Sequence, residues 1–181
     1  DNFGIQFTTV TSAQPASLII PNPGAFADES DNVPFPIPPN APVEGGLGAP
    51  SGADRHVLVV ETTNCILYEL YQAFPVNGGA NWSATSWARF DLKTNGPLRP
   101  AGWTSADAAG LPILPGLVRW EEVVAGEINH AIRMTAYTTL TALAACAKAD
   151  GDGVDTDNET DVDAQADTDV ASDTDAEADT D

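Results

Sequence analysis

Two apolar runs near the middle of the chain have the clearest pattern. Residues 55–61 (RHVLVVE) contain a short apolar stretch rich in β-branched side chains, and residues 65–71 (CILYELY) alternate between two faces. Runs of this length and composition are typical of β-strands. Because only residues 62–64 (TTN) separate the runs, we predict a β-hairpin in which Cys65 is a buried strand residue.

Weaker patterns flank this hairpin on both sides. Residues 1–20 alternate loosely and predict one or two short strands. After a turn at residues 77–79 (NGG), another strand or two is expected, with apolar positions at Trp82, Trp87, Phe90 and Leu92. Further along, residues 120–125 predict a brief helix stopped by Gly126.

Residues 127–135 (EINHAIRMT) alternate again. We predict a strand here, whose inner face carries Ile128, His130, Ile132 and Met134. Residues 21–50, in contrast, hold eight prolines and cannot form regular structure. This segment is expected to run extended as a wrapping loop, with Phe35 and Ile37 held against a surface; the alternative is a ligand for a peptide-recognition domain.

The chain therefore belongs to the mainly β class. We predict an irregular β-sandwich or open barrel over residues 1–135, with long Pro/Gly-rich loops and one or two short helices. An Ala-rich helix or linker follows at residues 136–149. Residues 150–181 form an acidic tail, which holds twelve Asp, two Glu and no basic residue. Because this tail has few apolar side chains and strong self-repulsion, we predict that it is disordered.

Charge and composition exclude several functions. The formal net charge is −20, and no basic stripe is present, so nucleic acid is not an expected partner. The sequence contains no run of eighteen apolar residues, so we expect no membrane-spanning helix. Two cysteines are too few for a structural zinc site. In the tail, Asp150, Asp152 and Glu159 match positions of a calcium loop, but Lys148 stands where an Asp is required, so we expect only weak calcium association and no other cofactor.

Residues 3–135 resemble an uncharacterised family of secreted bacterial proteins. The resemblance is carried by three stretches: ADESDNVPFPIPPNAPVEGG, DRHVLVVETTNCILYELY and RPAGWTSADAAGLPILPGLVRWEEVVAGEINHAIRMT. It implies secretion and one compact domain, and it brings no known activity or catalytic residue. Members of this family continue with more domain sequence after the HAIRMT-like strand, so the resemblance leaves open whether the domain is complete after Met134.

The sequence after Met134 has a second interpretation. Leu143, two alanines and Cys146 are similar to the end of a bacterial lipoprotein signal, which is often followed by an acidic linker. Such a signal stands at the start of a chain. The alternative is an ordinary Ala-rich helix of about three turns.

Few residues are available for catalysis. His56 and His130 both fall on apolar strand faces, and Asp107, Glu121 or Glu122 could supply a carboxylate. Together they could move protons near neutral pH or bind a divalent ion. The alternative is that both histidines are core residues bonded to the backbone.

The aromatic residues indicate a different function, the binding of a carbohydrate ligand. Tryptophan faces stack on sugar rings while polar side chains bind the hydroxyls, so Trp103, Trp82, Trp87 and Arg99 are candidate ligand-binding residues, with Trp120 as a further tryptophan. The alternative is that the tryptophans are core residues. Trp103, in a Pro/Gly-rich loop, is the one we expect to be exposed.

Three functions remain in competition, and whether the protein is an enzyme stays open. The leading hypothesis is a non-catalytic module, secreted or on the bacterial cell surface, with extracellular polysaccharide as its partner. Few lysines, together with many Thr, Asn and Gly, favour this location. The second hypothesis is a polysaccharide-acting hydrolase or lyase. The third is a structural or assembly protein that self-associates, completed by a neighbouring chain.

Overall fold

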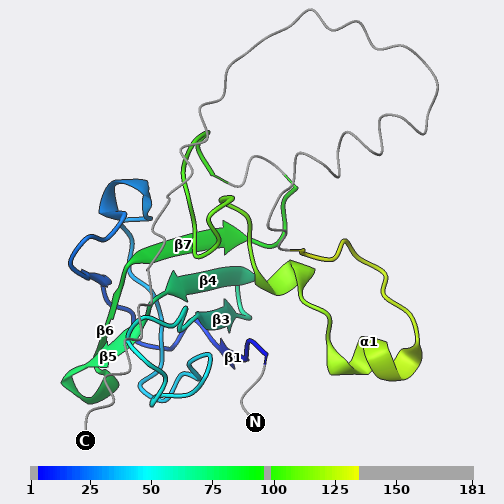
Figure 1. Cartoon of the computed structure of the whole chain (residues 1–181), viewed down its shortest axis with the longest axis horizontal. Helices are drawn as coiled ribbons and strands as arrows, with labels where there is room; N and C mark the ends of the chain where they lie inside the picture. The colour runs from blue at the N-terminus through cyan, green and yellow to red at the C-terminus, as the bar shows by residue number, and fades with distance from the viewer. Residues whose placement is uncertain (1–3, 96–98, 135–181) are drawn as a thin grey trace, which may run out of the picture. The chain divides into compact units, whose positions relative to one another are not determined.

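Residues 4–95 and 99–134 are described by the computed structural model, and within them the chain forms two mixed β-sheets (Figure 1). The first sheet has the strand order β1-β3-β4-β7: β1 (Phe7–Val10), β3 (Val57–Glu61), β4 (Ile66–Tyr71) and β7 (Ser86–Asp91). β1 pairs in parallel with β3, and the other pairs are antiparallel. The predicted mainly β class is confirmed.

The second sheet is smaller. Its order is β2-β6-β5, with β2 at Ile20–Pro21, β6 at Asn81–Ala84 and β5 at Phe74–Val76. β2 pairs in parallel with β6, and β5 pairs antiparallel with β6. Helical structure in the described residues is confined to the short helix α1 (Trp120–Ala125) and three 3₁₀ turns, η1 (Ala27–Glu29), η2 (Asn77–Gly79) and η3 (Leu114–Gly116).

The predicted hairpin is confirmed as β3 and β4, with Val57 opposite Leu70 and Glu61 opposite Ile66. The prediction for Cys65 is wrong. Its thiol is exposed, and its backbone has a φ of 58° because the residue belongs to the turn. The Glu61 carboxylate fixes this turn by accepting hydrogen bonds from the backbone N–H groups of Thr63 (2.6 Å) and Asn64 (3.1 Å).

The Pro-rich segment lies on one face of the larger sheet, as predicted. Phe35 and Ile37 are buried there, and an isolated bridge joins Phe35 to Ser17. The prolines prevent regular structure, so apolar side chains from successive short stretches complete this core. The core cluster on this face consists of Ile19, Phe35, Ile37, Ala41, Val43, Val57, Val59, Ile66, Tyr68, Leu70, Ala73, Trp82, Ala84 and Trp87.

The opposite face packs against residues 99–117. Leu58 contacts Ala106 and Ile113, and a neighbouring cluster joins Leu67, Ala88 and Phe90. One charged residue, Glu69 on β4, is fully buried on this face. Its carboxylate accepts hydrogen bonds from the backbone N–H groups of Ile113 and Leu114, each at 2.9 Å, where η3 begins.

Burial raises the pKa of Glu69 to about 7, although the two backbone donors and Arg133 act in the opposite direction. A buried carboxylate needs such donors, because transfer of an unpaired charge out of water is costly. Glu69 therefore anchors the loop that covers this face.

The predicted strand at residues 127–135 is wrong. Residues 127–134 contain no strand. Of the side chains expected on an inner face, Ile128, Ile132 and Met134 are exposed and His130 is half-buried. The helix at 120–125 is confirmed, and Gly126 ends it with a φ of 69°. The acidic tail, residues 136–149, Leu143, Cys146 and the calcium candidates Asp150, Asp152 and Glu159 lie outside the described residues.

None of the helices in the described part of the chain has the length and apolar character needed to cross a membrane.

Candidate functional site

The tryptophans divide into buried and exposed residues. Trp82 (1% exposed) and Trp87 (5%) belong to the core, so neither ring offers a face to a ligand. Trp103 is half-buried and has the Arg99 guanidinium 5.4 Å from its ring centre. Trp120, at the start of α1, is 74% exposed. The sequence pointed to Trp103 as the exposed ring, whereas Trp120 is the more exposed of the two.

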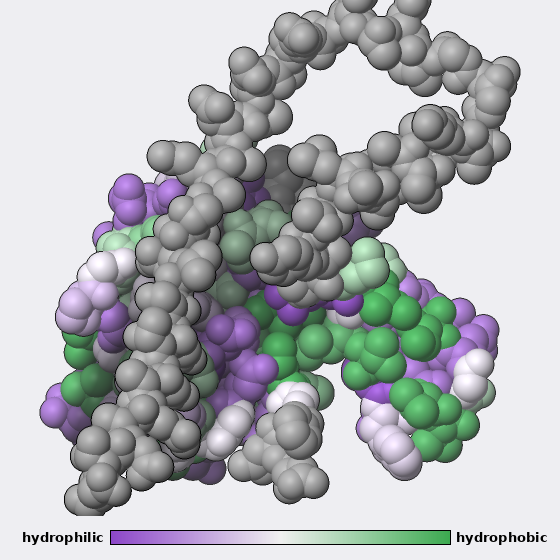
Figure 2. All heavy atoms as spheres, viewed as in Figure 1, coloured by the Kyte–Doolittle hydropathy of each residue, from purple (hydrophilic) through white to green (hydrophobic). Residues whose placement is uncertain are grey.

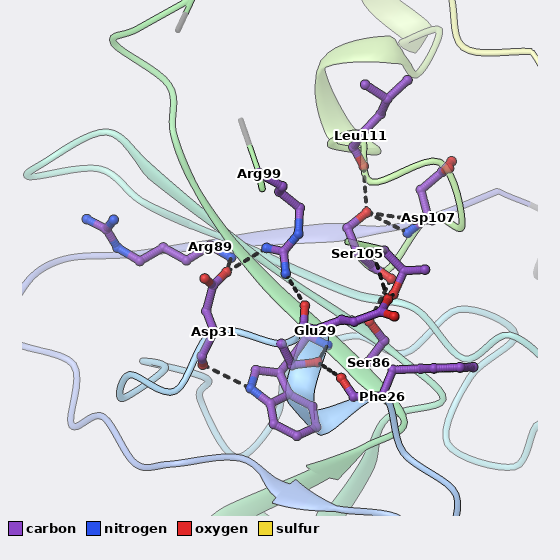
Figure 3. Close-up of polar contacts among 12 residues, drawn as sticks. Phe26, Glu29, Asp31, Ser86, Arg89, Arg99, Ser105, Asp107 and Leu111 are labelled. Carbon is purple, nitrogen blue, oxygen red and sulfur yellow. Dashed lines mark hydrogen bonds and ion pairs between the residues drawn. The ribbon is translucent and has the colours of Figure 1, made fainter. Parts of the chain in front are cut away.

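Arg99 is held by protein groups (Figure 3). Its guanidinium donates to the Asp31 carboxylate at 2.7 Å and to the Glu29 carbonyl, and its side chain is only 3% exposed. Asp31 also accepts the backbone N–H of Arg89. The Glu29 carboxylate in turn accepts two hydrogen bonds from Thr104, which lower the pKa of Glu29. Arg99 and its partners therefore fasten the loop at residues 99–104 to the segment around η1.

Asp107 and His130 both take part in fixing a projecting segment. We call residues 117–132 the arm, with α1 at its outer end, away from the two sheets (Figure 1). The base of the arm is closed where the Arg133 N–H donates to the Gly116 carbonyl at 2.9 Å and the Arg133 guanidinium pairs with Asp107. Within the arm, His130 Nε2 lies 2.8 Å from Glu122 Oε1.

Glu122 lies in the first turn of α1. Its carboxylate accepts hydrogen bonds from the backbone N–H of Arg119 (2.8 Å), the residue before the helix, and from the Arg119 guanidinium (2.7 Å). The hydrogen bonds from Arg119 lower the pKa of Glu122 to about 2. The carboxylate is therefore ionised and faces both Arg119 and His130. These contacts hold a six-residue helix that has no buried residue of its own.

A groove lies between the arm and the N-terminal part of the chain, with a volume of about 700 Å³. Trp120 forms part of its wall, together with apolar residues such as Phe7 and Leu117. Three polar side chains also line it: Gln6, Arg119 and Glu121. Figure 2 shows apolar residues gathered over the arm, at the right of the view. The groove thus combines an exposed aromatic ring with hydrogen-bonding groups of three kinds.

His56 lies elsewhere, just before β3, and is buried. Its Nδ1 is 2.6 Å from Glu44 Oε2, and its Nε2 is 3.1 Å from the Ala106 carbonyl oxygen. Asp54 is close enough that one donor atom from each of Glu44, Asp54 and His56 lies within 4.8 Å of the others. Tyr71 packs at a tilt against the imidazole, and burial and the charge of Asp54 raise the pKa of this tyrosine.

The partners of His56 and His130 differ, so the structure does not support one pocket shared by both rings. Sequence reasoning missed Glu44 as the partner of His56. The signal was present, since Glu44 is the only charged residue between Asp31 and Asp54. A lone charge inside a Pro/Gly-rich loop that wraps the core needs a partner, and a buried histidine supplies one.

Searches against protein-family models, curated proteins and solved structures found no match to this chain. The resemblance of residues 3–135 to a secreted bacterial family therefore stays a prediction.

Proposed function

We propose that this chain is a non-catalytic module that binds an extracellular polysaccharide in the groove beside Trp120, and that it is secreted or displayed on the bacterial cell surface. The observation that carries the proposal is the exposed ring of Trp120 on the wall of a 700 Å³ groove. The location rests on the low lysine content and on the resemblance of residues 3–135 to secreted proteins.

The chemistry of the groove fits a sugar. The C–H groups on one face of a pyranose ring pack on the indole of Trp120, and this contact needs a ring that is open to solvent. The amide of Gln6, the guanidinium of Arg119 and the carboxylate of Glu121 supply donors and acceptors for hydroxyl groups. Such a set favours binding of a neutral or weakly charged polysaccharide.

Binding is favoured over catalysis by the partners of the predicted acid–base residues. Both nitrogens of His56 face protein acceptors, His130 lies against Glu122, and Asp107 pairs with Arg133. Each of these described side chains already has a protein partner. A hydrolase or lyase needs an acid or base that can reach its substrate, so the enzyme hypothesis has less support.

A glycan array that includes bacterial and algal polysaccharides tests this proposal. We expect the full-length protein to bind a small set of neutral polysaccharides above background. The Trp120→Ala variant should lose this signal, and the Trp103→Ala variant should keep it. A wild-type protein with no binding across the array would refute the glycan assignment.

Self-association is the second candidate, and the aliphatic surface of the arm favours it. Val123, Val124 and Ile132 are exposed, and exposed apolar patches commonly mark interfaces. Each chain carries both the arm and the apolar groove at its base. In a dimer with a two-fold axis, the arm of each copy would therefore lie in the groove of the other copy. Light scattering after size exclusion would then give a dimer for the wild type and a monomer for Val124→Glu. A monomeric wild type at micromolar concentration contradicts this candidate.

A further inference from the structure

Three side chains with metal-binding donor atoms meet just before β3, away from the groove of the proposed function. Glu44 comes from the Pro-rich segment, and Asp54 and His56 precede Val57, the first residue of β3. One donor atom from each lies within 4.8 Å of the other two. The Glu44 N–H donates to the His56 carbonyl at 2.9 Å, so the two segments are joined through the backbone as well.

Both nitrogens of the His56 ring lie close to oxygen atoms of the protein. The Ala106 carbonyl oxygen only accepts hydrogen bonds, so the hydrogen of that 3.1 Å contact belongs to Nε2. Nδ1, the other ring nitrogen, lies 2.6 Å from a Glu44 carboxylate oxygen. A metal ion between these two groups would take Nδ1 and the carboxylate oxygen as ligands, while Nε2 keeps its contact with Ala106.

We propose that Glu44, Asp54 and His56 bind a first-row divalent metal ion, with Zn²⁺ as the ion to test. One imidazole nitrogen and two carboxylate oxygens form a mixed ligand set that suits Zn²⁺, and water completes the coordination. A histidine that binds a metal through one nitrogen usually donates its other N–H to a carbonyl or carboxylate. The hydrogen bond from His56 Nε2 to Ala106 is of this kind.

The negative charge of the two carboxylates and their accessibility to solvent also suit a cation. Asp54 is exposed and Glu44 is half-buried, so an ion reaches the site from solvent. The neighbouring cation, Arg55, points elsewhere: its guanidinium donates to the carbonyls of Ala73 and Ala49 and lies over the ring of Phe74. The two carboxylates therefore face the imidazole without neutralisation by this arginine.

The donor atoms are near the spacing that a metal ion needs. Ligand atoms of a tetrahedral zinc ion lie about 3.3 Å apart. To admit the ion, the Glu44 carboxylate has to move about 1 Å away from His56, and donor atoms that are as much as 4.8 Å apart have to move closer together.

Metal titration of the full-length protein tests the site. After treatment with chelator, Zn²⁺ binding is measured by competition with a chromophoric chelator in wild type, Asp54→Asn and Asp28→Asn. Asp28 is an exposed acid in η1, and it serves as the matched control. We expect Asp54→Asn to weaken the tightest Zn²⁺ site at least about ten-fold and Asp28→Asn to leave it unchanged.

Two further readouts separate this site from general cation binding by the acidic tail, which is common to all variants. Co²⁺ should give the visible absorption of a nitrogen-ligated ion, and Zn²⁺ should shift the NMR signals of the His56 ring. Glu44→Gln, at a half-buried position, should weaken both effects. Equal Zn²⁺ affinity in Asp54→Asn and Asp28→Asn, or a Co²⁺ spectrum of the hydrated ion alone, would overturn the proposal. Neither result bears on glycan binding at Trp120.

Discussion

Two segments of similar composition have opposite environments in this protein. β3 has the sequence VLVVE and α1 has the sequence WEEVVA. In β3, Val57, Leu58 and Val59 have no exposed surface, whereas Val123 and Val124 of α1 are 58% and 67% exposed. β3 lies between β1 and β4, so both of its faces and both of its edges are covered. α1 has no such neighbours, and its cap residues hold it in place.

The sheets and the arm therefore contribute unequally to stability. Apolar side chains in the sheets provide the burial that stabilises the fold. The same side chains in the arm stabilise little, because a six-residue helix without packing is unstable by itself. An exposed apolar segment held by specific polar contacts at its base is typical of an interaction surface. Substitutions should therefore separate stability, in the sheets, from binding, in the arm.

The largest expected difference is between two tryptophans. Replacement of Trp82 by Ala removes a fully buried ring from the core and should lower the free energy of unfolding by about 3 to 5 kcal/mol. Replacement of Trp120 by Ala should change it by less than about 0.5 kcal/mol. Urea denaturation followed by circular dichroism measures both. Equal losses would show that the arm packs in solution and that the two regions do not differ in this way.

A pH experiment tests the contact by which the Glu69 side chain of β4 holds the loop that precedes the arm. The pKa of Glu69 is about 7 in the folded state, compared with 4.5 for a free carboxyl group, because of burial. Between these values the folded protein keeps the proton and the unfolded chain loses it, so stability falls as pH rises from 4.5 to 7 and levels off above 7. The loss attributable to Glu69 is about 3 kcal/mol, as an upper estimate.

The matched variant is Glu69→Gln, whose amide oxygen still accepts the N–H groups of Ile113 and Leu114 but does not titrate. We expect the free energy of unfolding of wild type to fall by about 3 kcal/mol more than that of Glu69→Gln between pH 4.5 and pH 8. Arg133 and Asp107, the charged residues that also act on Glu69, are present in both proteins. Parallel pH profiles would show that Glu69 has an ordinary pKa.

A smaller effect is expected at the base of the arm. A Cβ atom at Gly116 would lie 2.6 Å from the Arg133 Cβ and 3.0 Å from its backbone nitrogen. Gly116→Ala should therefore open the hydrogen bond that closes the arm, at a cost of about 1 kcal/mol. Limited proteolysis should then cut residues 117–132 faster, while hydrogen exchange in β3 and β4 stays unchanged. Faster exchange in the strands would mean that the arm and the sheet unfold together.

The sequence predicted the parts of the fold that depend on local pattern. The β-branched run at β3, the turn before β4 and the Gly126 stop of α1 all follow from nearby residues. The strand predicted at 127–135 failed because alternation needs a neighbouring strand, and in the described part of the chain residues 127–134 pair with none. Cys65 was placed wrongly because the turn includes one more residue than the TTN stretch indicated.

The candidate site was harder to predict, because it depends on distant contacts. The indole of Trp82 is buried and that of Trp120 is exposed, and both follow from packing between segments far apart in sequence. The pairing of His56 with Glu44 crosses from the Pro-rich segment to the residues before β3. Nothing in the local pattern fixes such a contact, although the isolated charge of Glu44 indicates that it needs a partner.

The most direct test of the central claim is calorimetric titration of the full-length protein with the best polysaccharide from the array. Wild type and Trp103→Ala should bind with the same affinity, and Trp120→Ala should lose at least about ten-fold, which corresponds to the 1.4 kcal/mol expected when one stacking contact is removed. All three proteins must keep the same circular dichroism spectrum. Equal binding by Trp120→Ala, or loss of binding in Trp103→Ala alone, would contradict the assignment of the groove beside Trp120 as the binding site.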